Sequence, residues 1–198
     1  MTRAFRLCFA ITLAAAALLG APVAEAHLIG EHGAGFEAGI LHPLSGLDHL
    51  LVMIAVGIWA AQLGGRAIWA VPCAFVGFMV VGGLLAVSGI SMPLVEPGIL
   101  GSVLLFGLLI ATAARVPTVV GMAIVGLFAL FHGHAHGTEL PEAANPAAYA
   151  LGFVLATSFL HAVGLGLALM TGRIAPKPAL RVIGGGIAAA GVAMVAAL

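Results

Sequence analysis

Two short stretches of this chain concentrate histidine and carboxylate side chains. Residues 42–49 read HPLSGLDH, and residues 131–139 read FHGHAHGTE. Imidazole nitrogen and carboxylate oxygen together suit Ni²⁺, Co²⁺, Zn²⁺ or Cu²⁺. The pattern therefore predicts a site for a divalent metal ion, provided that the fold brings the two stretches together.

The first stretch is expected to begin a helix. Pro43 favours a helix start at or near itself, because proline disfavours the helical conformation in the residue before it. His42 then lies at the mouth and His49 lies about 9 Å into the helix, at about 1.5 Å per residue. Asp48 points roughly 100° aside from the stripe that holds these histidines. That stripe consists of His42, Gly46, His49 and Met53.

The second stretch presents a face of its own if it is helical. Spacings of i, i+4 and i+7 then align His132, His136 and Glu139. The two glycines between these residues weaken a helix, so a loosened turn is an equal alternative. His134 lies outside this face and is interpreted as a solvated loop residue.

Composition points to lipid as the surrounding solvent. Of 198 residues, 63% are hydrophobic and 7% are charged, a balance that no water-soluble single domain needs. The formal net charge is zero, which argues against nucleic acid as a partner, because such binding rests mainly on clustered Lys and Arg. A membrane protein with lipid contacts is the class that remains.

Residues 1–26 have the pattern of a cleaved signal peptide. Arg3 and Arg6 form a basic start, an apolar core follows, and residues 24–26 read AEA, a small-x-small cleavage pattern. Cys8 would leave with the signal, so Cys73 alone would remain. A disulfide framework and a cysteine-based zinc or iron–sulfur site are thereby excluded.

The mature chain, residues 27–198, is predicted to be one all-α permease domain of six transmembrane helices. A span needs about 20 apolar residues. Small residues recur at close helical spacing, which lets helix backbones approach in lipid and predicts a compact bundle. A homo-oligomer is left open. The six stretches are 43–62, 67–87, 97–114, 118–132, 147–170 and 179–198.

Charge orients these spans. Export of the N-terminus places the start of the mature chain outside, and the connections then alternate. We therefore expect the bacterial inner membrane, with both mature termini and both histidine stretches on the periplasmic side. The basic residues all fall in connections predicted to be cytoplasmic, as the positive-inside rule requires: Arg66, Arg115, Arg173, Lys177 and Arg181.

Other polar residues of the spans keep two interpretations, because ionisable groups in a bilayer are costly and usually functional. His161, beside Thr157 and Ser158, is either a hydrogen-bonded packing residue or a deeper relay position for the ion. Glu96 either favours the positive end of its helix or guides cations inward. Met53 is interpreted as packing rather than as a ligand.

With these residues in place, the chain resembles the HupE/UreJ family of nickel and cobalt permeases found beside hydrogenase and urease systems. The resemblance covers essentially the whole mature chain. It rests on His-Pro-x-x-Gly-x-Asp-His-x-x-x-Met at residues 42–53 and Phe-His-Gly-x-Ala-His-Gly-x-Glu at residues 131–139. It implies metal selection by His42, Asp48 and His49. Further contributions on the outside are implied for His132, His136, Glu139 and Glu96.

The predicted function is import of Ni²⁺, with Co²⁺ as the alternative ion. The chain has no glycine–lysine phosphate-binding loop, so it is expected to work without an ATPase of its own. The ion is cargo, and no permanently bound cofactor and no enzymatic activity are expected. Two alternatives stay open. One is an intramembrane zinc hydrolase in which Asp48 or Glu139 handles protons around a metal-bound water, and the other is a metal-binding accessory protein that does not transport.

Overall fold

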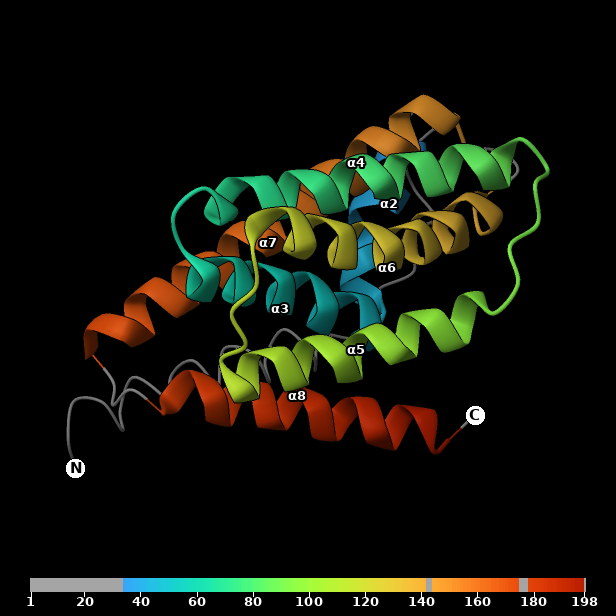
Figure 1. The fold of residues 1–198 in the computed structure, drawn as a ribbon. Helices are drawn as coiled ribbons and strands as arrows, with labels where there is room; N and C mark the ends of the chain where they lie inside the picture. The colour runs from blue at the N-terminus through green and yellow to red at the C-terminus, as the bar shows by residue number, and fades with distance from the viewer. Residues whose placement is uncertain (1–33, 142–143, 175–177, 198) are drawn as a thin grey trace.

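A computed structural model describes residues 34–141, 144–174 and 178–197 of the chain. These residues form helices without any strand (Figure 1), which confirms the all-α prediction for the described part. The predicted signal peptide lies outside the described residues. The helices are α2 (Ala34–Ser45), α3 (Leu47–Leu63), α4 (Ala67–Val87), α5 (Val95–Thr112), α6 (Thr118–Thr138), α7 (Pro146–Ile174) and α8 (Ala179–Val195).

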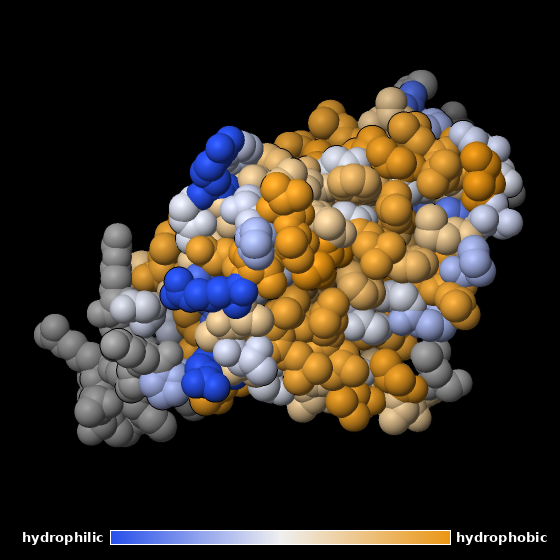
Figure 2. All heavy atoms as spheres, in the orientation of Figure 1, coloured by the Kyte–Doolittle hydropathy of each residue, from blue (hydrophilic) through white to orange (hydrophobic). Residues whose placement is uncertain are grey.

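The helices have the length and composition of membrane spans. Four of them, α4, α5, α6 and α7, are each long and apolar enough to cross a membrane, and α2 with α3 adds a fifth candidate as a bent pair. Helix α8 is apolar but has 17 residues, and it corresponds to the sixth expected span. The molecule also presents a broad hydrophobic face (Figure 2). The chain is therefore a multi-pass membrane protein.

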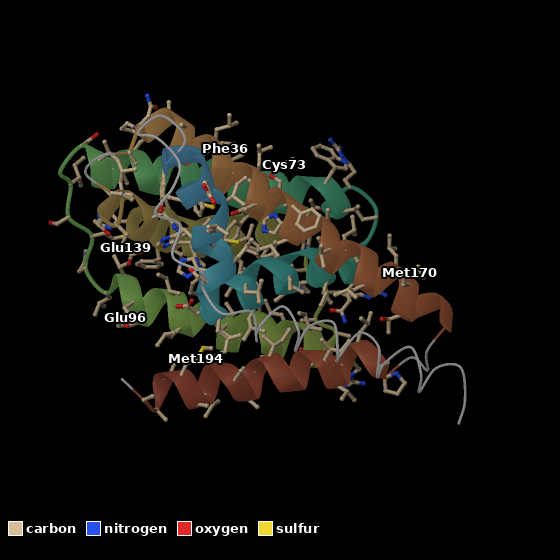
Figure 3. The ribbon with its side chains drawn as sticks, turned by 180° about the vertical axis from the view of Figure 1, so that it is seen from behind. Phe36, Cys73, Glu96, Glu139, Met170 and Met194 are labelled. Atoms are coloured by element: carbon tan, nitrogen blue, oxygen red, sulfur yellow. The ribbon has the colours of Figure 1, made fainter. Side chains whose placement is uncertain are left out.

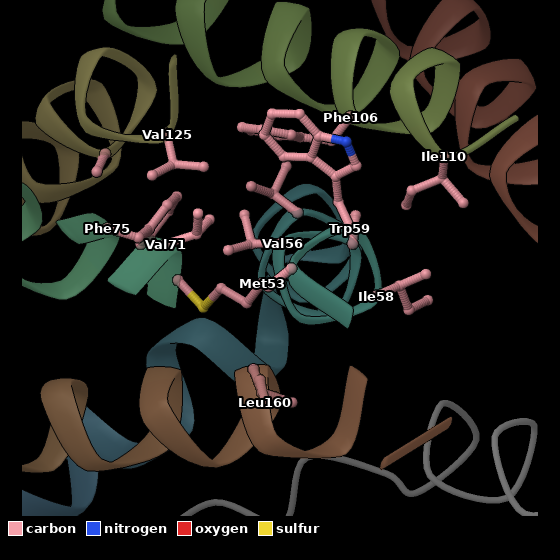
Figure 4. Packing of buried hydrophobic residues seen from close by; sticks show 14 of the residues in the cluster. Met53, Val56, Ile58, Trp59, Val71, Phe75, Phe106, Ile110, Val125 and Leu160 are labelled. Carbon is pink, nitrogen blue, oxygen red and sulfur yellow. The ribbon is translucent and has the colours of Figure 1, made fainter. Parts of the chain in front are cut away.

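Helix α3 lies at the centre of the bundle. It contacts α2 and all five later helices, and its side chains Met53, Val56 and Trp59 are fully buried. Figure 4 shows apolar residues of the neighbouring helices packed around α3. Helices α4 and α6 pair closely on one side of it, and α5 and α8 form a second pair at the edge of the bundle (Figure 1).

Glycine allows the closest of these approaches. A Cβ atom at Gly133 of α6 would run into the backbone carbonyl of Met79 on α4, and one at Gly57 of α3 would run into the backbone carbonyl of His161 on α7. In lipid, such packing takes the place of the hydrophobic effect as the force that associates helices. The compact bundle expected from the small residues is confirmed.

The first predicted span differs from the structure at its start. Pro43 does not begin a helix but lies in the last turn of α2, so His42 is helical as well. The chain then bends by 81° at Gly46, which has an extended conformation, and α3 begins at Leu47. Proline removes one helical hydrogen bond, and Ser45 Oγ donates to the His42 carbonyl at 2.8 Å where α2 ends. The predicted helix start at or near Pro43 was therefore wrong, because His42 and Pro43 both belong to α2 and the next helix begins after the bend.

The fourth predicted span is longer than expected at its end. Helix α6 continues through the second histidine stretch to Thr138 instead of ending near His132. Gly133 and Gly137 would favour a loosened turn in isolation, but both pack directly against the backbone of α4. Tertiary packing therefore keeps this stretch helical, and the helical alternative of the sequence analysis is the one observed. The other spans agree with the helices to within a few residues.

Charged residues separate between the two ends of the bundle. Arg66 precedes α4, Arg115 connects α5 to α6, and Arg181 lies in the first turn of α8, so the three arginines share one end. Strongly hydrophilic residues gather at the left of Figure 2, where Figure 1 places these connections. We call this the arginine end. The other end, where α3 starts and α6 stops, is the histidine end.

Candidate metal site

Four imidazole rings from three helices meet at the histidine end. The ring of His136, on α6, has its centroid 4.4 Å from that of His42 on α2 and 4.6 Å from that of His49 on α3. The ring of His132, one turn earlier on α6, lies 4.7 Å from that of His49. The bend between α2 and α3 brings the ring centroids of His42 and His49 to within 6.2 Å of each other. The fold thus brings the two histidine stretches together, as the sequence analysis required.

The cluster runs from the surface into the interior. The side chain of His42 is 28% exposed, whereas His49, His132 and His136 are buried. A hollow of about 260 Å³ opens at the surface above them. An ion arriving from the histidine end would therefore meet carboxylates and His42 before the buried imidazoles. The hollow is lined by His42, Ser45, Gly46, Asp48, His49 and Glu139.

Each carboxylate of the site contacts a histidine. Asp48 Oδ1 lies 2.8 Å from His49 Nδ1, and Glu139 Oε2 lies 2.9 Å from His42 Nε2. An ionised carboxylate can only accept hydrogen bonds, so His49 donates from Nδ1 and His42 donates from Nε2. The lone pairs then remain on His49 Nε2 and His42 Nδ1. Carboxylates commonly orient metal-ligating histidines in this way.

Several ring nitrogens of the cluster are buried without a hydrogen-bond partner among the described residues. They are His49 Nε2, His132 Nδ1 and both nitrogens of His136. Each unpartnered buried polar atom costs about 1–3 kcal/mol, so their concentration in one place is costly for the fold. Nitrogen lone pairs facing no donor are what a divalent cation needs from imidazole ligands. The donor set fits such an ion.

The described side chains do not form a finished coordination shell. Among them, no group of three His, Cys, Asp or Glu residues is arranged to hold one ion. The carboxylates of Asp48 and Glu139 lie at hydrogen-bond distance from His49 and His42 rather than from a shared point. Ion binding at this site therefore requires side chains to turn, and a carboxylate could replace its histidine contact by a metal contact as they do.

Two predicted site residues lie apart from the cluster. Glu96 is exposed in the first turn of α5, at the same end of the bundle as Glu139 (Figure 3), and forms no ion pair within the described ranges. His161 is buried on α7, with its ring 5.1 Å from that of Phe75. Neither ring nitrogen of His161 has a hydrogen-bond partner in the described part of the chain. The Phe75 ring also lies 5.6 Å from that of His132, so Phe75 contacts both His161 and the cluster.

His134 and Met53 are structural. His134 is buried, and its Nε2 donates to the Ile90 carbonyl at 2.9 Å, which ties α6 to the connection before α5. Its interpretation as a solvated loop residue was wrong, because α6 continues past it and packs it against α4. Met53 is fully buried and its sulfur accepts a hydrogen bond from Thr157 Oγ1 at 3.3 Å. Its interpretation as a packing residue agrees with this.

One polar contact of the cluster was missed. Ser102 of α5 is fully buried, and its Oγ lies 3.0 Å from His132 Nε2. The residue stands alone in an apolar helix, 30 positions before His132 in the chain. Nothing in its local spacing marks it, and only the packing of α5 against α6 brings the two side chains together.

Comparisons with known proteins identify the relatives of this chain. The family model described as HupE / UreJ protein matches residues 14–194. Protein HupE of Rhizobium leguminosarum bv. viciae is 48% identical to this chain over 184 residues, which are 93% of this chain and 96% of that protein. No solved structure matches the chain. The matched region contains every residue of the histidine cluster and both of its carboxylates.

Proposed function

The chain belongs to the HupE / UreJ family, and we propose that it is a permease that imports Ni²⁺ across the bacterial inner membrane, as the resemblance to nickel and cobalt permeases implies. Co²⁺ is the alternative ion, because imidazole and carboxylate ligands suit both. Supply of a hydrogenase or urease maturation system is the proposed purpose.

The observation that carries this proposal is the convergence of four imidazoles from α2, α3 and α6 in one cluster at the histidine end of the bundle. Four of their ring nitrogens are buried without a partner among the described residues. Ionisable groups inside a bilayer are costly and mark ion pathways. Neutral imidazoles bind a divalent ion weakly enough for release, and the two carboxylates offset its charge as water is shed.

The proposed direction of transport follows from the two ends of the bundle. The arginine end is assigned to the cytoplasm by the positive-inside rule. The histidine end, with its open hollow, then faces the periplasm, as do both mature termini. Glu96 and Glu139 would attract cations to this end, and His161 would be a deeper position on the same route.

The membrane potential can drive such import without ATP. Moving a divalent cation inward is worth about 4.6 kcal/mol per 100 mV, twice the single-charge value. At about 1.4 kcal/mol per factor of ten, that corresponds to roughly a thousandfold accumulation. The chain needs no nucleotide-binding element for this purpose.

Uptake of radioactive nickel into proteoliposomes that contain this protein alone tests the proposal. With an inside-negative potential, wild-type protein should accumulate the ion, and the His49→Ala variant should not. His134→Gln is the matched control, because His134 is a buried histidine outside the cluster. Its hydrogen bond to the Ile90 carbonyl can be replaced by one from the glutamine amide. Wild-type vesicles without uptake would contradict a permease and favour a non-transporting metal-binding protein.

A further inference from the structure

Ser102 lies on α5, which contributes no imidazole to the histidine cluster, but its side chain contacts the cluster. Its Oγ lies 3.0 Å from Nε2 of His132 and 2.5 Å from the carbonyl oxygen of Ile99 on its own helix. Ser102 and His132 are both fully buried. The hydrogen bonds of the Ser102 hydroxyl therefore decide the state of the His132 ring.

The hydroxyl has one hydrogen to share between these two neighbours. The carbonyl of Ile99 has no hydrogen of its own, and two oxygens 2.5 Å apart need a hydrogen between them. Ser102 thus donates to Ile99 and accepts from His132. It follows that the ring of His132 is protonated on Nε2 and carries its lone pair on Nδ1.

That lone pair is not engaged by another described group. His132 Nδ1 has no hydrogen-bond partner among the described residues, and the neighbouring ring of His49 is 4.7 Å away. An acceptor on one nitrogen of a ligating histidine fixes the tautomer and the orientation of the ring. Asp48 and Glu139 accept a hydrogen bond from His49 and His42 in this way. Ser102 is the neutral acceptor that orients His132.

We infer that Ser102 is a positioning residue of the metal site, which holds His132 in the Nε2-protonated tautomer so that Nδ1 can ligate the transported ion. The nickel-binding consequence of this inference rests on the proposed function. The tautomer itself is a property of the protein without metal, so the two can fail separately.

Two measurements on the purified full chain in nanodiscs test the inference. In metal-free protein labelled with ¹⁵N-histidine, the NMR chemical shifts of the ring nitrogens report which nitrogen of His132 is protonated, and the signal is assigned by its loss in His132→Gln.

Titration with Ni²⁺ then compares the nickel affinity of the wild type with that of Ser102→Ala. Loss of an orienting partner typically weakens metal binding about 10- to 100-fold. Ser158→Ala is the control, because Ser158 Oγ makes the same type of bond to a backbone carbonyl but is exposed on α7.

We expect Nε2 protonation of His132 in the wild type, at least a roughly tenfold loss of nickel affinity in Ser102→Ala, and wild-type affinity in Ser158→Ala. Protonation of His132 on Nδ1 in the wild type would overturn the inference, and so would unchanged nickel affinity in a folded Ser102→Ala protein. If Ser102→Ala does not fold, the wild-type tautomer decides. If the wild type binds no nickel, the proposed function fails, and the tautomer still decides whether Ser102 positions His132.

Discussion

The histidine end and the arginine end of the bundle differ in how many of their buried polar atoms have a hydrogen-bond partner among the described residues. At the arginine end, side-chain donors reach backbone carbonyls near the end of α5: Trp59 Nε1 donates to Ala114 at 3.1 Å, and Gln62 Nε2 donates to Ile110 at 3.2 Å. At the histidine end, ring nitrogens of the cluster are left without partners in the described part of the chain. Gln62 Oε1 at the arginine end also lacks a partner among the described residues, but it is a single atom, whereas four ring nitrogens of the cluster lack one.

The same helix carries both arrangements. His49 and Trp59 are ten positions apart on α3, or about 15 Å at about 1.5 Å per residue. Between them lies an apolar layer in which Val56, Phe75 and Phe106 are fully buried (Figure 4). The site is thus open toward the histidine end and closed toward the arginine end. On the proposed function, import requires the closed half to open, so the two ends should respond differently to substitution.

The largest effect on nickel uptake is expected for His136→Leu at the histidine end. Leucine fills a similar space but has no nitrogen, so the substitution removes two buried ring atoms without partners among the described residues. Nickel uptake should fall to background, while the protein should become more stable by about 1 kcal/mol or more. Uptake into vesicles and the unfolding temperature measure the two effects. Normal nickel uptake would contradict a ligand role for His136, and a loss of stability would contradict the cost assigned to its unpartnered nitrogens.

A smaller effect on the same end is expected for Asp48→Asn. The asparagine oxygen can still accept from His49 Nδ1, but the charge that strengthens this hydrogen bond and offsets the cation is lost. We expect the affinity for Ni²⁺ to fall by about tenfold, with little change in stability. A titration of uptake against nickel concentration measures it. An unchanged half-saturating concentration would show that the carboxylate neither orients His49 nor meets the ion.

Gly133→Ala tests whether the packing of α6 on α4 holds the cluster in place. The added Cβ would collide with the Met79 carbonyl, so the two helices must separate. Overpacking of this kind costs about 1–3 kcal/mol, and both stability and nickel uptake should decrease. Gly77→Ala on α4 is the control, because a Cβ there meets nothing within 4 Å. Equal effects of the two substitutions would mean that the close approach of α4 and α6 does not matter.

The predictability of these two ends differs for a physical reason. Hydrophobic runs and the separation of charge were sufficient to place α4 at residues 67–87 and to put Arg66, Arg115 and Arg181 at one end. Such signals are local, because span length and flanking charge depend on the membrane rather than on the other helices. The bend at Gly46 is not local. It depends on α2 packing against α7, where a Cβ at Gly39 would meet the backbone of Tyr149.

The sequence indicated most of the side chains that the structure brings together, although Glu96 and His161 lie apart from them, but it did not indicate their contacts. The spacing of His132 and His136 indicated a shared helical face, and the structure places both rings beside His49. The pairing of Glu139 with His42 could not be read from spacing, because it joins α2 to the end of α6 through the bend. Ser102 could not be found either, since its role depends on contact between helices distant in the chain.

The smallest effect is expected at the arginine end, for Trp59→Phe. Phenylalanine keeps an aromatic ring in the apolar layer but loses the hydrogen bond to the Ala114 carbonyl, which costs about 1 kcal/mol. The unfolding temperature should decrease, and the affinity for Ni²⁺ should not change, because Trp59 contacts no residue of the cluster within the described ranges. Nickel titration and thermal unfolding of the same preparation separate the two. A weakened affinity for Ni²⁺ at unchanged stability would mean that substitutions at the arginine end affect ion binding even while that end is closed. The bundle could then not be divided into a binding end and a stabilising end.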